Sequence, residues 1–291
     1  MIVNLDARCR GSLHVRKNKP LQDFSASMTD SRKTYGYALV ADGHGGERYI
    51  RSEIGSEIGV KCTVEAMNNV LKELLNYIKN KDFNVIDKSL KNLCSRILVL
   101  WREKVRKHFD ENPLTENELE LCEKLKISVS ISEDNIVRLY GSTLLAAVYF
   151  ENFDFWFTLQ IGDGKTVIIK NDDSVSYPIP EDEDQGYGMS NSLCGKTASE
   201  KFYYAYGFEK IAGICVMSDG MTDSFEFEKL PDFLVRIKNN ALQDIEKTKE
   251  ELTTFLPKLS EQGSQDDISI AGLFVKEEKK FNFLDKFRKL I

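Results

Sequence analysis

Three apolar runs in this chain end in Asp-Gly, and that repeated ending constrains the fold more than any other feature. The runs are YALVADG, FTLQIGDG and ICVMSDG, closing at Asp42-Gly43, Asp163-Gly164 and Asp219-Gly220. Short aromatic and β-branched runs bounded by turn residues predict buried strands. Asp-Gly is also the commonest short hairpin signal, so each ending taken alone favours a turn over a ligand.

Taken together, the acidic endings point to a binding site. A carboxylate at a strand end lies on rigid backbone at the rim of a sheet, and several at one rim form an oxygen-rich site for hard divalent cations. The run DGHGG also carries His44 and two glycines that no turn requires, and a further acidic pair, Asp266-Asp267, opens an apolar run. The sequence therefore predicts a metal centre.

Composition excludes several other classes of protein. The chain has 291 residues and a net charge of −6, which disfavours nucleic-acid partners because these require dense positive charge. Six cysteines without CxxC spacing and only three histidines disfavour a zinc site and suit a reducing compartment. The N-terminus has no signal-peptide core, and the longest apolar run, LLAAVYF, is too short for a transmembrane segment. We expect a cytoplasmic protein.

Hydrophobic periodicity predicts an order of strands and helices. We expect strands over residues 35–41, 127–131, 137–150, 153–161, 166–170, 211–217 and 268–275, long helices over 47–79 and 90–109, a capped helix over 113–126, an exposed loop over 178–200 and two helices between 217 and 259. Strands joined by short turns favour antiparallel sheets. The predicted fold is α+β, a four-layer α/β/β/α sandwich of two antiparallel sheets flanked by helices.

Six motifs occur in an order that identifies a family resemblance: QD at 22–23, DGHGG at 42–46, GST at 141–143, GDG at 162–164, SDGMTD at 218–223 and QDDISI at 265–270. The chain resembles the bacterial form of the metal-dependent serine/threonine protein phosphatases of type 2C. The resemblance implies a catalytic domain over residues 1–275. It leaves a basic amphipathic tail, 276–291, that could bind a membrane surface, a partner or the domain itself.

The resemblance also implies residue roles. Asp42 would bridge two metal ions, the Gly43 carbonyl would bind one of them, and Asp219 and Asp267 would bind the other. Asp23 would hold metal-bound water, Asp163 with Asp219 would bind a third, weaker metal, and His44 would be the general acid. The implied reaction is hydrolysis of phosphoserine and phosphothreonine in proteins by a metal-bridging hydroxide, with a cognate serine/threonine kinase as a further partner.

Elementary chemistry explains why such residues suit this reaction. Two divalent ions neutralise the phosphoryl oxygens and lower the pKa of a water between them, and oxygen ligands favour Mn²⁺ or Mg²⁺ over zinc. A histidine can then donate a proton to the departing oxygen. The missing side chain of Gly43 lets its carbonyl approach an ion closely.

Phosphate anchoring is where the chain departs from the family pattern. Asn18 stands where better-known members have an arginine, so Arg16, Lys17 or Lys19 would have to bind the phosphate, and Lys165 replaces the arginine of the family's GDSR. His14 is expected to be structural. Two alternatives therefore stay open: a pseudophosphatase that binds partners without turnover, and a phosphatase of small metabolites. A nucleotide-binding kinase is disfavoured because both glycine-rich phosphate motifs are absent from the sequence.

Overall fold

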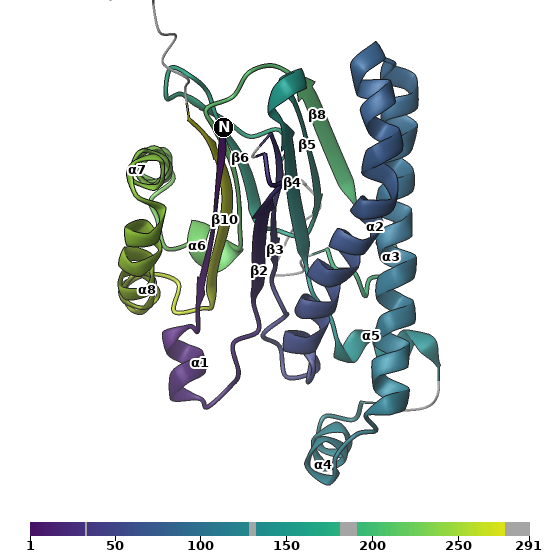
Figure 1. The fold of residues 1–291 in the computed structure, drawn as a ribbon. Helices are drawn as coiled ribbons and strands as arrows, with labels where there is room; N and C mark the ends of the chain where they lie inside the picture. Colours follow the sequence, from purple (N-terminus) through teal and green to yellow (C-terminus); the bar gives the residue numbers. More distant parts are fainter. Residues whose placement is uncertain (33, 128–131, 181–190, 277–291) are drawn as a thin grey trace, which may run out of the picture.

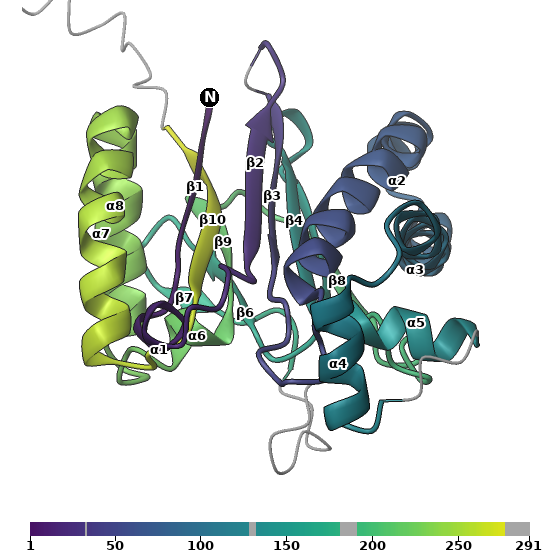
Figure 2. The ribbon, with the colours of Figure 1, turned by 90° about the horizontal axis from the view of Figure 1, so that it is seen from below.

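The computed structural model describes residues 1–32, 34–127, 132–180 and 191–276, and in these it has four layers. Figure 1 shows two sheets facing each other, with a pair of helices on each outer side, and Figure 2 shows the same layers from below. The predicted α+β sandwich is confirmed.

The first sheet has the strand order β1-β10-β9-β6-β7, with every neighbouring pair antiparallel. Its strands are β1 (Ile2–Cys9), β10 (Ile268–Val275), β9 (Gly213–Met217), β6 (Lys165–Ile169) and β7 (Val175–Ser176). The predicted strand over 268–275 is confirmed at both ends. β9 and β6 match the predictions over 211–217 and 166–170 to within two residues.

The second sheet has the order β2-β3-β4-β5-β8 and is also antiparallel throughout. Its strands are β2 (Phe24–Thr29), β3 (Tyr35–Ala41), β4 (Leu144–Phe150), β5 (Phe155–Ile161) and β8 (Tyr203–Phe208). The side chains of β4 and β5 are buried along the whole of both strands, as expected for central strands covered on two faces. A 3₁₀ turn, η1 (Glu151–Phe153), joins them.

Helices cover the outer face of each sheet. The helices α2 (Ser52–Asn80) and α3 (Phe83–Glu111) pack on the second sheet, and α7 (Leu230–Gln243) and α8 (Ile245–Gln262) pack on the first. A third buried cluster, which includes Val40, Leu145 and Val216, lies between the sheets. Three apolar layers therefore join four layers of secondary structure.

Four short helices complete the described chain: α1 (Ser12–Arg16), α4 (Glu116–Lys124), α5 (Glu133–Leu139) and α6 (Asp219–Thr222). The cap predicted for α4 is confirmed, because Thr115 and Glu118 form a reciprocal capping box. No helix in the described residues is both long and apolar enough to span a bilayer. Five of the six cysteines are buried, and Cys9 is half-buried.

The structure corrects the expected strand over residues 137–150. Residues 133–139 form the helix α5, and the strand begins only at Leu144. The apolar side chains of Ile136, Val137 and Leu139 pack into the core from a helical turn, a pattern that a short apolar run does not distinguish from a strand. Most of the expected strand over 127–131, part of the loop over 178–200, and nearly all of the tail lie outside the described residues.

Antiparallel pairing brings the acidic strand ends to one edge of the sandwich. Asp42 follows β3 and Asp163 follows β5, while Asp23 precedes β2, which runs antiparallel to β3. In the other sheet, Asp219 follows β9 and Asp266 precedes the antiparallel β10. Residues that are distant in sequence therefore meet at the same end of both sheets.

Candidate metal centre

Asp42 and Asp219 lie close enough to share a hydrogen bond between their carboxyl groups. Burial is the main cause of the raised pKa of Asp42, and the negative charges of Asp23, Asp219 and Asp266 add to it. Burial also raises the pKa of Asp219 to about 6, with contributions from Asp163, Asp266 and Asp223. Clustered carboxylates of this kind are costly to ionise unless a cation compensates them.

The backbone holds Asp42 rigidly at the end of β3. Its amide donates to the Thr143 hydroxyl over 3.0 Å, and its carbonyl accepts from the Thr143 amide over 2.8 Å. Gly43 forms a bridge with Ser142, and a Cβ on it would lie 2.6 Å from the carbonyl oxygens of both Gln22 and Ser52. Gly43 is therefore required for this close approach of backbone segments, in addition to any role of its carbonyl.

Asp23 is a buried carboxylate with one oxygen left without a hydrogen bond. Its side chain is almost wholly buried, and burial followed by the charge of Asp267 raises its pKa well above the ordinary range. Oδ2 accepts from the Ser269 hydroxyl over 2.7 Å, whereas Oδ1 has no hydrogen-bond partner among the described residues. Buried polar atoms are normally satisfied, so the free oxygen fits a cation or an ordered water.

Asp266 and Asp267 are adjacent but have different surroundings. The two oxygens of Asp267 accept from the amides of Gly11 and Gln22, each over 2.6 Å, and the residue is 2% exposed. The side chain of Asp266 is 52% exposed, and its charge raises the pKa of both Asp42 and Asp219. Asp266, rather than Asp267, therefore faces the carboxylate pair.

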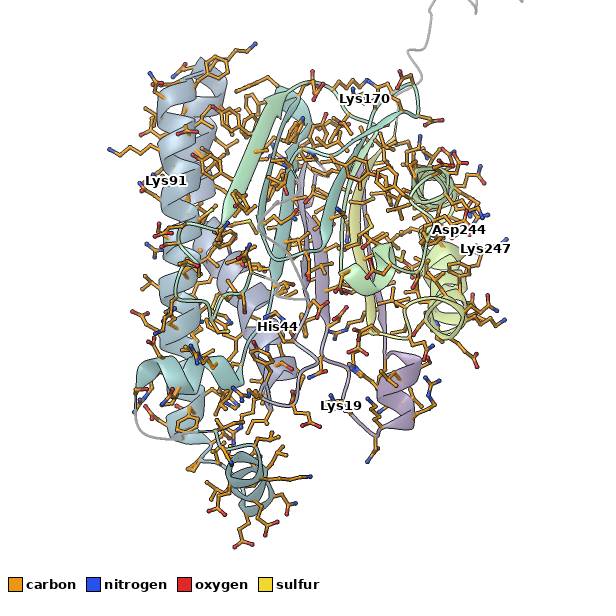
Figure 3. The ribbon with its side chains drawn as sticks, turned by 180° about the vertical axis from the view of Figure 1, so that it is seen from behind. Lys19, His44, Lys91, Lys170, Asp244 and Lys247 are labelled. Atoms are coloured by element: carbon orange, nitrogen blue, oxygen red, sulfur yellow. The ribbon has the colours of Figure 1, made fainter. Side chains whose placement is uncertain are left out.

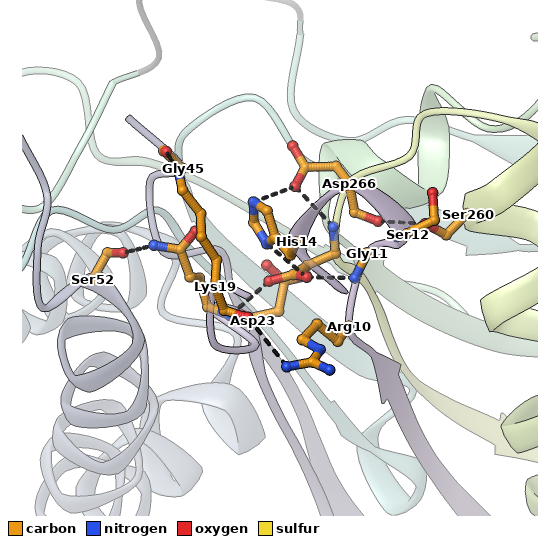
Figure 4. A network of polar contacts seen from close by, with 12 residues as sticks. Arg10, Gly11, Ser12, His14, Lys19, Asp23, Gly45, Ser52, Ser260 and Asp266 are labelled. Atoms are coloured by element: carbon orange, nitrogen blue, oxygen red, sulfur yellow. Dashed lines mark hydrogen bonds and ion pairs between the residues drawn. The ribbon is translucent and has the colours of Figure 1, made fainter. Parts of the chain in front are cut away.

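His14 links these two acidic residues, and Figure 4 shows its contact with Asp266. Its buried ring places Nδ1 2.9 Å from Oδ1 of Asp267 and Nε2 3.6 Å from Oδ1 of Asp266. One ligand-type atom from each of His14, Asp266 and Asp267 lies within 4.8 Å of the others. The protein's own amides already occupy Asp267, so this cluster fixes α1 against the start of β10.

His44 lies beside the carboxylates in a half-buried position. Its amide donates to the Gly141 carbonyl over 3.1 Å, and its ring packs against Tyr49 with 4.7 Å between centroids. Burial lowers the pKa of His44, and the negative charge of Asp163 opposes that shift. Asp163 is thus close to both His44 and Asp219.

The three predicted phosphate-binding residues have different environments. Arg16 donates to the side chain of Gln265, and Lys17 is exposed at the end of α1. Lys19 instead reaches the DGHGG loop, where Nζ donates to the Gly45 carbonyl over 2.6 Å. Figure 3 shows Lys19 and His44 at one end of the sandwich, with Lys170 at the other.

Sequence reasoning missed two acidic residues of this site. Asp266 belongs to the QDDISI motif, from which the sequence predicts Asp267 as the ligand. Asp223 was present in SDGMTD, and burial together with the charge of Asp163 raises its pKa. The signal available in both cases was a second carboxylate in a motif already recognised as functional.

This four-layer arrangement with an acidic edge is the fold of the α/β/β/α phosphatases. The sequence matches the protein phosphatase 2C family over residues 10–257, and the chain belongs to that family. This membership supports serine/threonine protein phosphatase activity, and the family is metal-dependent. No curated protein matches the sequence.

Solved structures share the fold at low sequence identity. PppA, described as a key regulatory component of the type VI secretion system in Pseudomonas aeruginosa, has a TM-score of 0.57 and 13% identity, covering 94% of this chain and 97% of its own. The catalytic domain of the phosphatase PstP in complex with two manganese ions has a TM-score of 0.54 and 12% identity, with coverages of 95% and 100%. The S. agalactiae serine/threonine phosphatase has a TM-score of 0.53 and 15% identity, with coverages of 95% and 100%.

Proposed function

We propose that this protein hydrolyses phosphoserine and phosphothreonine in proteins, using Mn²⁺ or Mg²⁺ held at the acidic edge of the sandwich. The observation that carries the proposal is the convergence of Asp42, Asp219 and Asp266 beside the unpaired oxygen of Asp23. Besides burial, the charges of Asp219 and Asp266 raise the pKa of Asp42, and the charge of Asp266 also raises the pKa of Asp219. Hard oxygen ligands of this kind suit Mn²⁺ or Mg²⁺.

The proposed ligands follow from these surroundings. Asp42, Asp219 and Asp266 would hold the ions together with the Gly43 carbonyl, and Asp23 would hold water beside them. When bound, the ions would neutralise phosphoryl charge and lower the pKa of the attacking water. The sequence predicted Asp267 in place of Asp266. We favour Asp266 because its neighbour already accepts two amide hydrogen bonds.

His44 is proposed to donate a proton to the departing serine or threonine oxygen. The Tyr49 ring and the hydrogen bond from the His44 amide to Gly141 fix the position of the imidazole. Because burial lowers the pKa of His44 below its ordinary value of 6.5, most of the protonated form is lost before the pH reaches neutrality. Lys19, which reaches the same loop, is the strongest of the three proposed phosphate-binding residues.

Manganese-dependent phosphate release from phosphoserine and phosphothreonine peptides tests the proposal, together with calorimetric titration of Mn²⁺. We expect Asp42→Asn and Asp266→Asn to abolish turnover and weaken Mn²⁺ binding at least tenfold. Asp267→Asn is the matched comparison, and we expect it to lower the melting temperature more than Asp266→Asn does, because it disturbs two buried hydrogen bonds.

Two outcomes would count against this assignment. Manganese binding without turnover of any phosphopeptide would favour the pseudophosphatase, which draws support from the engagement of Arg16 by Gln265 and from Asn18 at the arginine position. Full metal affinity in Asp266→Asn, with loss in Asp267→Asn, would restore Asp267 as the ligand.

A further inference from the structure

A basic cavity lies beside the candidate metal centre. It has a volume of about 420 Å³, and its lining includes Arg48, Arg138, Lys196 and Lys201 but no acidic side chain among the described residues. This local excess of positive charge contrasts with the net charge of −6 for the whole chain. We call this cavity the basic pocket. Its charge suits an anionic ligand.

Tyr49 forms a wall between the basic pocket and the metal centre. It lines the pocket, and its ring packs 4.7 Å from the ring of His44, centroid to centroid. Gly141 permits this arrangement, because a Cβ there would lie 2.5 Å from the Tyr49 ring and 2.8 Å from the His44 ring. A ligand in the pocket would therefore be separated from the proposed proton donor by one aromatic ring.

Backbone contacts hold the floor of the pocket in register with the metal centre. The Ser192 hydroxyl and the Leu193 amide both donate to the Ser142 carbonyl, over 3.1 and 2.9 Å. Ser142 in turn pairs with Gly43. The two sites are thus connected through Ser142 in two short steps, which fixes their separation and favours a ligand of defined spacing.

Two of the cations are placed to meet an anion from solvent. Arg48 and Arg138 are exposed, and neither forms an ion pair with any residue that the structure describes. Both charges act on the Tyr49 phenol, although burial dominates and raises its pKa, so the phenol stays protonated and able to donate. Arginine forks and a phenol suit phosphate or carboxylate oxygens.

We propose that the basic pocket binds a second anionic group of the substrate, a carboxylate or a second phosphate, carried on the segment whose phosphoserine or phosphothreonine enters the metal centre. This inference rests on the proposed phosphatase function and adds the class of substrate. The protein would thus select phosphorylated segments with acidic or multiply phosphorylated flanks.

Steady-state kinetics on three matched phosphopeptides test this inference. The peptides share one target phosphoserine and differ at flanking positions, which carry Asn and Gln, Asp and Glu, or a second phosphoserine. We expect kcat/KM to be about tenfold higher for the anionic peptides than for the Asn/Gln peptide, mainly because KM is lower. A tenfold effect is about what one charge-assisted hydrogen bond contributes to binding. The relative rates of the two anionic peptides identify the preferred anion.

In the double variant Arg48→Gln/Arg138→Gln we expect about the same kcat/KM for all three peptides. The control variant Arg96→Gln should keep the tenfold preference. Arg96 is exposed on α3 and lies outside the lining of the basic pocket. The same tenfold preference in the double variant, or no preference in the wild-type protein, would overturn the proposal.

Binding without turnover separates this inference from the phosphatase assignment. Fluorescence anisotropy of a labelled Asp/Glu peptide that lacks phosphoserine measures the basic pocket alone. We expect about tenfold weaker binding to the Arg48→Gln/Arg138→Gln protein than to the wild-type or Arg96→Gln proteins. If the protein shows this difference in binding but hydrolyses no phosphopeptide, anion binding by the basic pocket is supported and the phosphatase assignment is rejected. Equal binding of the peptide to all three proteins would reject anion binding by the basic pocket.

Discussion

Replacing Asp219 by Asn should stabilise the metal-free protein at neutral pH. Burial and neighbouring carboxylates raise the pKa of Asp219 to about 6, from an ordinary value of 3.8. At 1.36 kcal/mol for each pKa unit, this rise corresponds to about 3 kcal/mol. The variant would keep the contact from the Gly220 amide, because the Asn side-chain oxygen can accept it in place of Oδ1.

The sign follows from proton linkage. Between pH 4 and 6 the folded protein binds a proton at Asp219 that the unfolded chain releases, so this contribution to stability is full below pH 4 and is lost as the pH rises through 6. At pH 7.5 the metal-free wild-type protein therefore bears the whole penalty, and Asp219→Asn removes it. We expect the melting temperature in EDTA to rise by roughly 6 °C, at about 2 °C for each kcal/mol in a chain of this size.

Thermal unfolding in EDTA and in saturating Mn²⁺, at pH 4 and pH 7.5, provides the measurement. With Mn²⁺ at a hundredfold excess over Kd, the wild-type protein should gain about 2.7 kcal/mol, and the variant much less. The control Glu120→Gln removes an exposed carboxylate of α4 and should change neither value. An Asp219→Asn protein that unfolds at or below the wild-type temperature in EDTA at pH 7.5, or whose melting temperature rises as much at pH 4, would show that ionised Asp219 does not destabilise the metal-free protein.

Two further predictions concern stability away from the metal centre. The Glu118 carboxylate accepts hydrogen bonds from the buried Arg51, which lowers the pKa of Glu118 to about 2. Glu118→Gln should therefore reduce the free energy of unfolding in urea by about 3 kcal/mol at pH 7, and this loss should shrink as the pH falls below 4.5. An unchanged free energy of unfolding at pH 7 would contradict this prediction. Lys81 follows the last turn of α2 with φ = 52°, a backbone conformation that favours glycine, so Lys81→Gly should raise the free energy of unfolding by about 0.5–1 kcal/mol. A destabilised variant would show that the contact of Lys81 with the Phe208 ring outweighs the backbone strain.

The strands that the sequence failed to predict share one property. All six inner strands, β3, β4, β5, β6, β9 and β10, were expected from their apolar runs. The four that were missed, β1, β2, β7 and β8, lie at the edges of the two sheets. An edge strand pairs on one side only and is less completely buried, so its side chains alternate weakly or remain polar, as Asp6 and Arg8 do in β1.

Interpretation of the site from sequence was limited in a different way. The Asp-Gly strand ends identified Asp42 and Asp219 because each follows a recognisable buried strand. The choice between Asp266 and Asp267 could not be made that way, because neighbouring side chains point in different directions and only the surrounding chain determines which one is enclosed. The amides of Gly11 and Gln22, far away in sequence, enclose Asp267.

The four layers and the acidic character of the centre can be predicted without coordinates, because burial periodicity and motif order are local properties of the chain. The folded chain alone shows which carboxylates face one another, that Lys19 rather than Arg16 reaches the DGHGG loop, and that Arg48 and Arg138 line one pocket. These features depend on charges and hydrogen bonds summed over segments that meet only after folding, and no spacing along the chain encodes them.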